Sequence, residues 1–204
     1  MPRFDLSPSE LRAYRSEAVE PADFDAFWAQ TLADHSPTGA TASLTRLDTQ
    51  LRLVDVWDVT FAGYDGHPVK AWLRLPAGAS GPLPGVVEYV GYGGGRGLPH
   101  EHLVWPVCGY AHLLMDTRGQ GSAWSLGETP DPTGSGPSFP GFMTRGIESP
   151  DTYYYRRVYV DAVRAIETLR TVPSIDPDRI GVTGVSQGGG ISIAAAGLVP
   201  GLRA

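Results

Sequence analysis

The 204-residue sequence has a single cysteine, Cys108, so no disulfide can form within the chain. The first ten residues, MPRFDLSPSE, also lack the apolar stretch that a secretory signal requires. Both absences lead us to expect a cytoplasmic protein, because disulfides and secretory signals accompany export. Since free cysteines are usually buried and this one lies in an apolar stretch, we expect Cys108 to be a buried structural thiol.

Clustered basic residues and long apolar runs are missing too. The net charge is −6, with 16 Lys and Arg against 22 Asp and Glu, and there is no basic stripe. This balance argues against nucleic-acid binding, because contacts with phosphates need clustered Lys and Arg. No stretch approaches the roughly 18 apolar residues of a membrane-spanning helix. The hydrophobic fraction of 42% is nevertheless enough for a core, so we expect one domain over residues 1–204.

Apolar periodicity predicts strands that alternate with helices along most of the chain. Helices are expected over residues 21–32, 98–107, 151–171 and 187–198, and strands over residues 54–61, 69–75, 85–90, 111–116 and 179–185. Such alternation is typical of an α/β protein with a mostly parallel sheet and helices on both faces. The first two strands, joined by a short turn, are the expected antiparallel exception. Residues up to about 35 are expected to form a helical N-terminal extension.

A serine motif lies between the last expected strand and the last expected helix. Residues 184–188 read Gly184-Val185-Ser186-Gln187-Gly188, which is G-x-S-x-G in the context of a nucleophile elbow. In such an elbow a strained turn lifts the serine hydroxyl above the sheet, and the two glycines permit close backbone packing. We therefore predict that Ser186 is a catalytic nucleophile. The alternative is a phosphate-binding or merely tight turn between a strand and a helix.

A serine nucleophile also needs backbone amides that stabilise the oxyanion formed when it attacks an ester. One donor is the amide after the serine, here Gln187, and the other comes from the loop after the third strand. The glycine-rich residues 91–97 directly follow the expected strand 85–90, and we predict the Tyr92 amide as the second donor. The alternative of a dinucleotide-binding loop fails, because Arg96 stands where the G-x-G-x-x-G pattern requires glycine.

The acid and the histidine of a catalytic triad are not found where the chain order requires them. In α/β-hydrolases the order is Ser, then Asp or Glu, then His. All five histidines precede Ser186, and no acidic residue follows it. His100 and His102, near the glycine-rich loop, are interpreted as ordinary helix or loop residues. We therefore expect the triad acid and histidine beyond Ala204, together with C-terminal strands that are missing from this sequence.

Several longer stretches resemble one known family. They read PADFDAFW (21–28), DVTFAGYDGHPVKAWLRLP (58–76), VEYVGYGGGRGLPHEHLVWP (87–106), MDTRGQGS (115–122), TYYYRRVYVDAVRAIE (152–167) and GVSQGGG (184–190). Over about residues 11–198 the sequence thereby resembles carbohydrate esterase family 7, the acetyl xylan esterases and cephalosporin-C deacetylases. Two family signatures are intact, RGQ at Arg118-Gly119-Gln120 and G-x-S-Q-G-G around Ser186. The third, a His-Glu pair that carries the triad histidine, is absent from these residues.

The resemblance implies a serine carboxylesterase in which Ser186 attacks an acetyl ester and the Tyr92 and Gln187 amides hold the oxyanion. Acetylated xylo-oligosaccharides, cephalosporin C and other small acetyl esters all remain possible substrates. The resemblance also implies no metal or organic cofactor, and a homohexamer whose active sites face an internal cavity. Arg118 and Gln120 are expected to support the site, although a tight turn tied by the arginine side chain explains them equally well.

Two other functions remain open. A serine peptidase of the prolyl-oligopeptidase type uses a G-x-S-x-G-G elbow as well, but it usually has an aromatic residue after the nucleophile, where this chain has Gln187. The RGQ signature and the YYYRR segment further disfavour this peptidase. The other possibility is a catalytically inactive scaffold that keeps the hydrolase fold. The reading frame beyond Ala204 distinguishes an inactive scaffold from an esterase.

Overall fold

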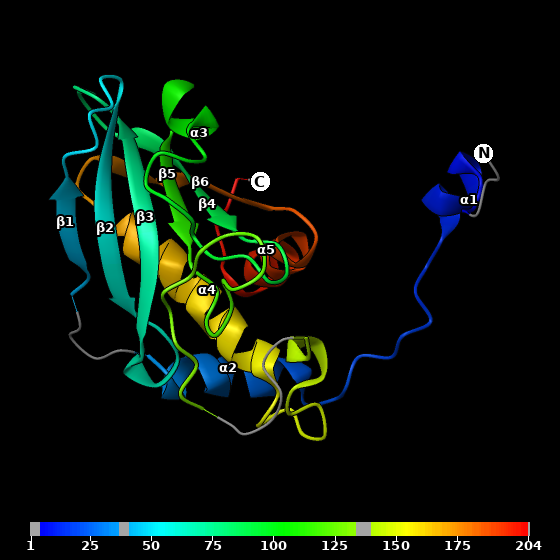
Figure 1. Ribbon diagram of the computed structural model, residues 1–204. Coiled ribbons are helices and arrows are strands. Elements are labelled where there is room, and N and C mark those ends of the chain that lie inside the picture. The colour runs from blue at the N-terminus through cyan, green and yellow to red at the C-terminus, as the bar shows by residue number, and fades with distance from the viewer. Residues whose placement is uncertain (1–4, 37–40, 134–139, 204) are drawn as a thin grey trace.

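A six-stranded sheet forms the centre of the structure, which is a computed structural model that describes residues 5–36, 41–133 and 140–203 (Figure 1). The strands lie in the order β1-β2-β3-β5-β4-β6. Their bounds are β1 Ser43–Leu47, β2 Val54–Ala62, β3 Pro68–Pro76, β4 Leu83–Tyr89, β5 Ala111–Met115 and β6 Ile175–Gly184. The helices are α1 Pro8–Ala13, α2 Phe24–Asp34, α3 Val104–Val107, α4 Tyr154–Arg170 and α5 Gln187–Leu198, with 3-10 turns η1 Tyr64–Gly66 and η2 Phe142–Thr144.

The main core lies between the sheet and the helices α4 and α5. Alternate residues of a strand point to opposite faces, and in β3 the residues Val69, Ala71 and Leu73 all point into this core. From the other side α4 contributes a helical stripe that is almost fully buried, including Val158 and Ile166. The helix predicted over residues 151–171 from the same stripe is confirmed, and it spans Tyr154–Arg170.

The second face of the sheet carries a smaller core of Val54, Val56 and Trp72, with Leu103 packed against it. The residues before α3 cover part of this face, since Trp72 Nε1 donates a hydrogen bond to the Gly97 carbonyl. The helix expected over residues 98–107 is shorter, because only its last turn is helical.

Cys108 is exposed, which contradicts the expectation of a buried thiol. It follows the last residue of the four-residue helix α3 and lies in the turn that leads to β5. An apolar sequence neighbourhood therefore did not mean burial here, because the neighbours Val104 and Val107 are themselves exposed.

The α/β class is confirmed, with one correction to the strand directions. The pairs β1–β2, β2–β3 and β3–β5 are antiparallel, and the pairs β4–β5 and β4–β6 are parallel. The short η1 turn makes β2 and β3 antiparallel, whereas the crossovers through α3 and α4 produce the parallel pairs. Strand β1 was not predicted, because its residues are mostly exposed and carry no clear alternation. The antiparallel part is thus larger than the single hairpin expected.

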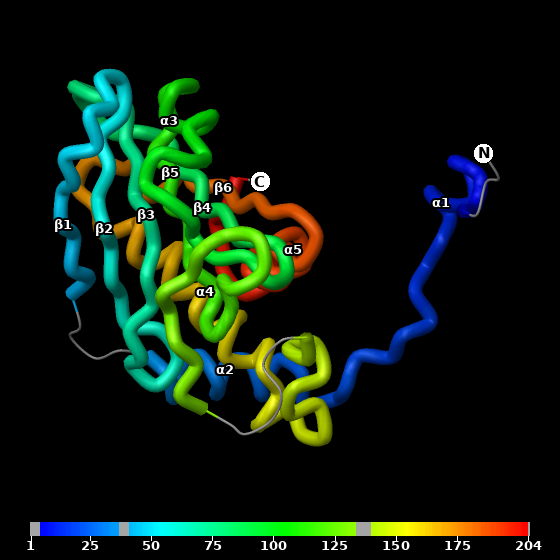
Figure 2. The backbone as a smooth tube through the Cα atoms, in the orientation of Figure 1, coloured from blue at the N-terminus to red at the C-terminus, as the bar shows by residue number. Residues whose placement is uncertain are grey.

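The N-terminal residues lie largely outside this core. Helix α2 begins at Phe24 rather than at residue 21, and Thr31 is its one buried member. The short helix α1 has a capping box, in which Ser7 and Glu10 exchange side-chain and backbone hydrogen bonds. The segment that carries α1 reaches away from the rest of the chain (Figure 2). None of the helices in the described ranges is long and apolar enough to cross a membrane.

Candidate active site

Ser186 lies in a strained turn between β6 and α5, as the nucleophile elbow predicts. Its backbone angles are φ 57° and ψ −119°, a conformation that non-glycine residues rarely adopt. The residue is the N-cap of α5, and its carbonyl accepts a hydrogen bond from the Gly190 amide at 3.1 Å. Its side chain is exposed at the end of the edge strand β6. The strain is held by the packing around it and presents the hydroxyl to solvent.

Gly184 and Gly188 are required by the closeness of the backbones that meet at the elbow. A Cβ atom on Gly184 would lie 2.3 Å from the carbonyl carbon and oxygen of Gly188. A Cβ atom on Gly188 would lie 2.0 Å from the Tyr89 carbonyl oxygen at the end of β4. No side chain larger than hydrogen fits at either position without moving backbone. The predicted reason for these two glycines, close backbone packing, is therefore confirmed.

The amino end of α5 provides the electrostatic setting for an anion. Gln187 is the first residue of this helix, so its amide is one of the groups with no carbonyl partner inside the helix. Among the described residues, none accepts a hydrogen bond from this amide, and none bonds with the Ser186 hydroxyl. The partial positive charge at a helix N-terminus favours a developing oxyanion. The role of the Gln187 amide as an oxyanion donor remains a prediction.

The glycine-rich loop 91–97 packs beside the elbow. The strands β4 and β6 are parallel neighbours, with Tyr89 opposite Gly184, so the segments that follow them emerge at the same edge of the sheet. A Cβ atom on Gly91 would lie 3.4 Å from the Val185 carbonyl oxygen. The loop that carries Tyr92 thus passes directly against the residue before Ser186. The geometry suits the predicted second oxyanion donor, which also remains a prediction.

Trp124 covers this loop, and the sequence analysis did not single it out. The residue is 60% exposed, and its indole Nε1 donates a hydrogen bond of 2.8 Å to the Tyr92 carbonyl. A Cβ atom on Gly94 would lie 2.3 Å from the same indole, so the glycine is needed for this packing. At the other end of the Tyr92 side chain, the hydroxyl accepts hydrogen bonds from the amides of Gly141 and Phe142. Both ends of Tyr92 are therefore held in place.

Gln120 joins the glycine-rich loop to the elbow. Its Oε1 accepts a hydrogen bond of 2.7 Å from the Gly93 amide, and its Nε2 donates to Gln187 Oε1 at 2.8 Å. Gln187 Nε2 in turn donates to the Val90 carbonyl at 3.2 Å. The glutamine of the RGQ signature, Gln120, is thus in direct contact with Gln187, the glutamine of the G-x-S-Q-G signature. Neither signature reveals this contact on its own.

Arg118 is a fully buried structural residue. Its guanidinium donates two hydrogen bonds to Asp161 of α4, at 2.6 and 2.8 Å, and one to Asp131 at 3.2 Å. Burial on its own lowers the pKa of Arg118, but the carboxylates of Asp161 and Asp131 outweigh it and raise that pKa. The Arg118 carbonyl accepts a hydrogen bond from Tyr154. These contacts agree with a turn tied by the arginine side chain, and the site-supporting role of Arg118 stays a prediction.

Asp116, just before the RGQ segment, also anchors the glycine-rich loop 91–97. Its buried carboxylate accepts hydrogen bonds from the backbone amides of Arg96, Glu128 and Thr129, at 2.9, 2.6 and 2.8 Å. Burial raises the pKa of Asp116. The Arg96 guanidinium stacks over Trp72 with 3.8 Å between the guanidinium carbon and the ring centroid. Arg96 therefore fixes the loop to the sheet.

The hydrogen bonds that the described histidines form are with residues other than Ser186. His112 and His102 contact the Glu88 carboxylate at 2.9 and 3.0 Å, and His35 contacts Asp65. Burial alone would raise the pKa of Glu88, but the hydrogen bonds with the two histidines outweigh it and lower the pKa to about 2. None of these residues bonds with Ser186. The interpretation of His102 as an ordinary loop residue is thus consistent with its contacts.

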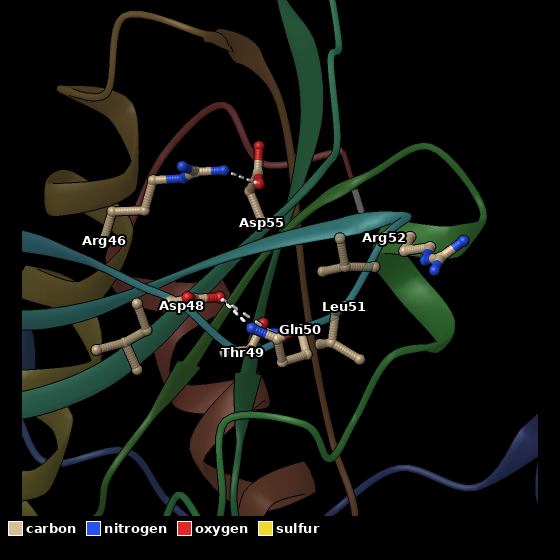
Figure 3. Close-up of a pocket in the computed structure, with 9 residues that line it drawn as sticks. Arg46, Asp48, Thr49, Gln50, Leu51, Arg52 and Asp55 are labelled. Carbon is tan, nitrogen blue, oxygen red and sulfur yellow. Dashed lines mark hydrogen bonds and ion pairs between the residues drawn. The ribbon is translucent and has the colours of Figure 1, made fainter.

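A separate polar pocket lies where β1 leads into β2, as Figure 3 shows. It is lined mainly by charged and amide side chains, and Arg46 forms an ion pair with Asp55 across it. The strands β1 and β6 are the two edges of the sheet, so this pocket is separated from Ser186 by the full width of the sheet. Within the described residues, no group of three or more His, Cys, Asp and Glu is arranged to hold a metal ion.

Comparisons with known proteins place this chain in a family. The sequence profile of the acetyl xylan esterase (AXE1) family matches residues 1–204. An acetyl esterase of Xylanibacter ruminicola is 30% identical over 197 residues, which cover 96% of this chain and 44% of that protein. Two solved acetyl xylan esterases are similar as well. The one from Paenibacillus sp. R4 is 39% identical with a TM-score of 0.84, over 97% of this chain and 62% of that one.

The second structure, acetyl xylan esterase 1 from Thermoanaerobacterium sp. JW/SL YS485, is 29% identical with a TM-score of 0.86. The match covers 98% of this chain and 62% of that one. The chain therefore spans between 44% and 62% of the length of these relatives, and its sheet is part of an α/β-hydrolase domain. The resemblance found in the sequence is confirmed: the chain belongs to the acetyl xylan esterase family, carbohydrate esterase family 7.

Proposed function

We propose that the protein containing this chain is a serine esterase that removes acetyl groups from small esters, with Ser186 as its nucleophile. The observation that carries the proposal is the strained backbone of Ser186 at the amino end of α5, beside the glycine-rich loop. The relatives named above, described as acetyl and acetyl xylan esterases, support the acetyl group as the one removed. Because the chain spans only part of their length, the activity belongs to the whole protein.

The proposed reaction begins when the Ser186 hydroxyl oxygen attacks the acetyl carbonyl carbon. The carbonyl oxygen becomes an oxyanion, which the amides of Gln187 and Tyr92 stabilise through hydrogen bonds. Collapse of this intermediate breaks the bond to the alcohol and leaves an acetyl group on Ser186. Water then attacks the acetyl-enzyme, and acetate leaves.

A base must take the proton of the serine hydroxyl and return it to the departing alcohol. No histidine or acidic residue follows Ser186 in this sequence. We propose that both come from residues beyond Ala204, which agrees with the greater length of the relatives. This division leaves the nucleophile and both proposed oxyanion donors in the present residues.

The proposal also covers the substrates, the cofactors, the location and the oligomeric state of the complete protein. Acetylated xylo-oligosaccharides, cephalosporin C and other small acetyl esters are the candidate substrates, and the reaction described needs no metal or organic cofactor. We further propose that the complete protein is a cytoplasmic homohexamer. The net charge of −6 supports a protein that does not bind nucleic acid.

The test compares p-nitrophenyl acetate hydrolysis by the protein, expressed from its complete natural reading frame, with hydrolysis by two variants. Ser186→Ala should lower kcat by several orders of magnitude, as removal of a triad serine does. Ser43→Ala is the matched control, because Ser43 is an exposed serine on the opposite edge of the sheet. If Ser186→Ala retained more than about a tenth of the kcat, the proposed nucleophile would be wrong.

A further inference from the structure

Two glutamine side chains make a reciprocal contact between the two halves of the site. Gln120 Nε2 lies 2.8 Å from Gln187 Oε1, and Gln187 Nε2 lies 3.2 Å from Gln120 Oε1. Gln120 follows β5 and is 6% exposed, whereas Gln187 begins α5. The pair therefore connects two segments that are 67 residues apart in sequence.

The orientation of both amides is fixed by groups that can play only one role. The Gly93 backbone N–H can only donate, so the atom of Gln120 that it contacts must be the oxygen. The Val90 carbonyl can only accept, so the atom of Gln187 facing it must be the NH₂ nitrogen. The inner atoms of the pair then match, with each nitrogen facing an oxygen.

Two tyrosines of helix α4 support the same arrangement. The Tyr154 hydroxyl donates to the Arg118 carbonyl, which leaves its oxygen to accept a hydrogen bond of 3.0 Å from Gln120 Nε2. The Tyr155 hydroxyl donates to Gln187 Oε1 at 2.8 Å. Each glutamine is therefore held by its partner, by backbone and by a tyrosine. A network satisfied in this way has one preferred geometry.

We infer that Gln120 and the Gln187 side chain are positioning residues, which hold the Tyr92 loop and the Ser186 elbow at a fixed separation. The inference rests on the proposed function, because it concerns the two amides predicted to bind the oxyanion. The Tyr92–Gly93 peptide is held at its N–H by Gln120 and at its carbonyl by Trp124. Fixing this peptide restricts the backbone angles of Tyr92, and with them the direction of its amide.

Loosening the glutamine pair should affect catalysis more than substrate binding. Oxyanion donors accelerate a reaction only when they are aimed in advance at the place where charge develops. Substrate in its ground state gains little from that alignment, so a loosened pair should lower kcat and leave KM nearly unchanged. This pattern separates a positioning role from a structural role, which would lower the amount of folded protein instead.

The first experiment replaces each glutamine with methionine, which has similar length and no amide. In the complete protein, Gln120→Met, Gln187→Met and the double variant should each lower kcat for p-nitrophenyl acetate about 10- to 100-fold, the scale expected for misplaced groups. The double variant should be little worse than either single one, because both break the same contact. A trifluoromethyl ketone, which adds to a serine to form a tetrahedral oxyanion, should bind more weakly in proportion to the loss of kcat/KM.

The second experiment uses adjacent tyrosines as a matched pair. Tyr155→Phe removes the hydroxyl that bonds with Gln187, and kcat should fall several-fold. Tyr153→Phe removes a hydroxyl that donates instead to the Met143 carbonyl, and kcat should not change. If Gln120→Met does not give folded protein, this pair decides the question, and equal kcat values for the two phenylalanine variants would overturn the inference.

The outcomes also separate this inference from the proposed function. If Ser186→Ala is inactive while folded Gln120→Met and Gln187→Met keep the full kcat and ketone affinity, the esterase stands and the positioning role is wrong. If Ser186→Ala retains activity, the proposed nucleophile fails, whatever the glutamine variants do. A raised KM with unchanged kcat would likewise contradict the positioning role.

Discussion

Alanine at position 188 tests the packing of the elbow on the end of β4. A methyl group on Gly188 would lie 2.0 Å from the Tyr89 carbonyl oxygen, whereas ordinary contact begins near 3.4 Å. The Tyr89 oxygen is a backbone atom and the position of the methyl group is set by the backbone of residue 188, so no side-chain rotation relieves the overlap. The amino end of α5 or the carboxyl end of β4 must move instead, and Ser186 must move with it.

The expected change in unfolding free energy follows from the size of that overlap, and a glycine in the same helix provides a control. Overpacking of this kind costs roughly 1–3 kcal/mol of unfolding free energy, and sometimes more. Gly190, two residues further along α5, has nothing within 4 Å of its Cβ position. Gly190→Ala should therefore stabilise the protein by about 0.5–1 kcal/mol through helix propensity. The two alanine variants should differ by roughly 1.5–4 kcal/mol in unfolding free energy.

The assay is thermal unfolding of both variants, together with hydrolysis of p-nitrophenyl acetate. For a domain of this size 1 kcal/mol corresponds to about 2–4 °C, so the two Tm values should lie at least about 3 °C apart. Gly188→Ala should also lose roughly 10- to 100-fold in kcat, because the nucleophile is displaced. Equal Tm and kcat for the Gly188 and Gly190 variants would refute the close approach that the structure shows.

Three further predictions concern stability and specificity. Arg118→Met leaves Asp161 buried without its partner, and should lower the free energy of unfolding in urea by about 3–5 kcal/mol; a loss below about 1 kcal/mol would contradict the buried ion pair. Burial lowers the pKa of His112, so the unfolded chain binds a proton before the folded one does. The Tm should therefore fall as the pH decreases from 7 to 5, and His112→Gln should weaken this dependence. An equal slope of Tm against pH in the variant and the wild-type protein would contradict the role given to His112. Acetyl p-nitrophenyl ester should give a higher kcat/KM than the butyryl ester, and equal or better turnover of butyryl would argue against a pocket for acetyl groups.

The elbow could be predicted from sequence because its physics is local. Gly184, Ser186 and Gly188 lie within five consecutive residues, and the strand and helix that flank them have clear patterns. The same holds for α4, whose buried stripe repeats at the helical period. In both cases one segment contains all the information that the prediction needs.

The contacts between segments could not be predicted in this way. Gln120 was expected to support the site, yet its contact with Gln187 depends on how β5 and β6 flank β4 in the sheet. Trp124 lies in a segment without periodicity, and only the fold places its indole over Gly94. Cys108 was predicted to be buried from its neighbours in sequence, but it lies in an exposed turn after α3, whose residues Val104 and Val107 are exposed too.

The most direct test of the central claim is to find which residue an acyl-like probe modifies. The complete protein would be treated with a fluorophosphonate, which reacts with activated serines, and the modified peptide identified by mass spectrometry. The account predicts one adduct per chain, on Ser186, with loss of acetyl-ester hydrolysis in parallel. An active protein whose adduct lies on any other residue, or whose activity survives full modification of Ser186, would contradict it.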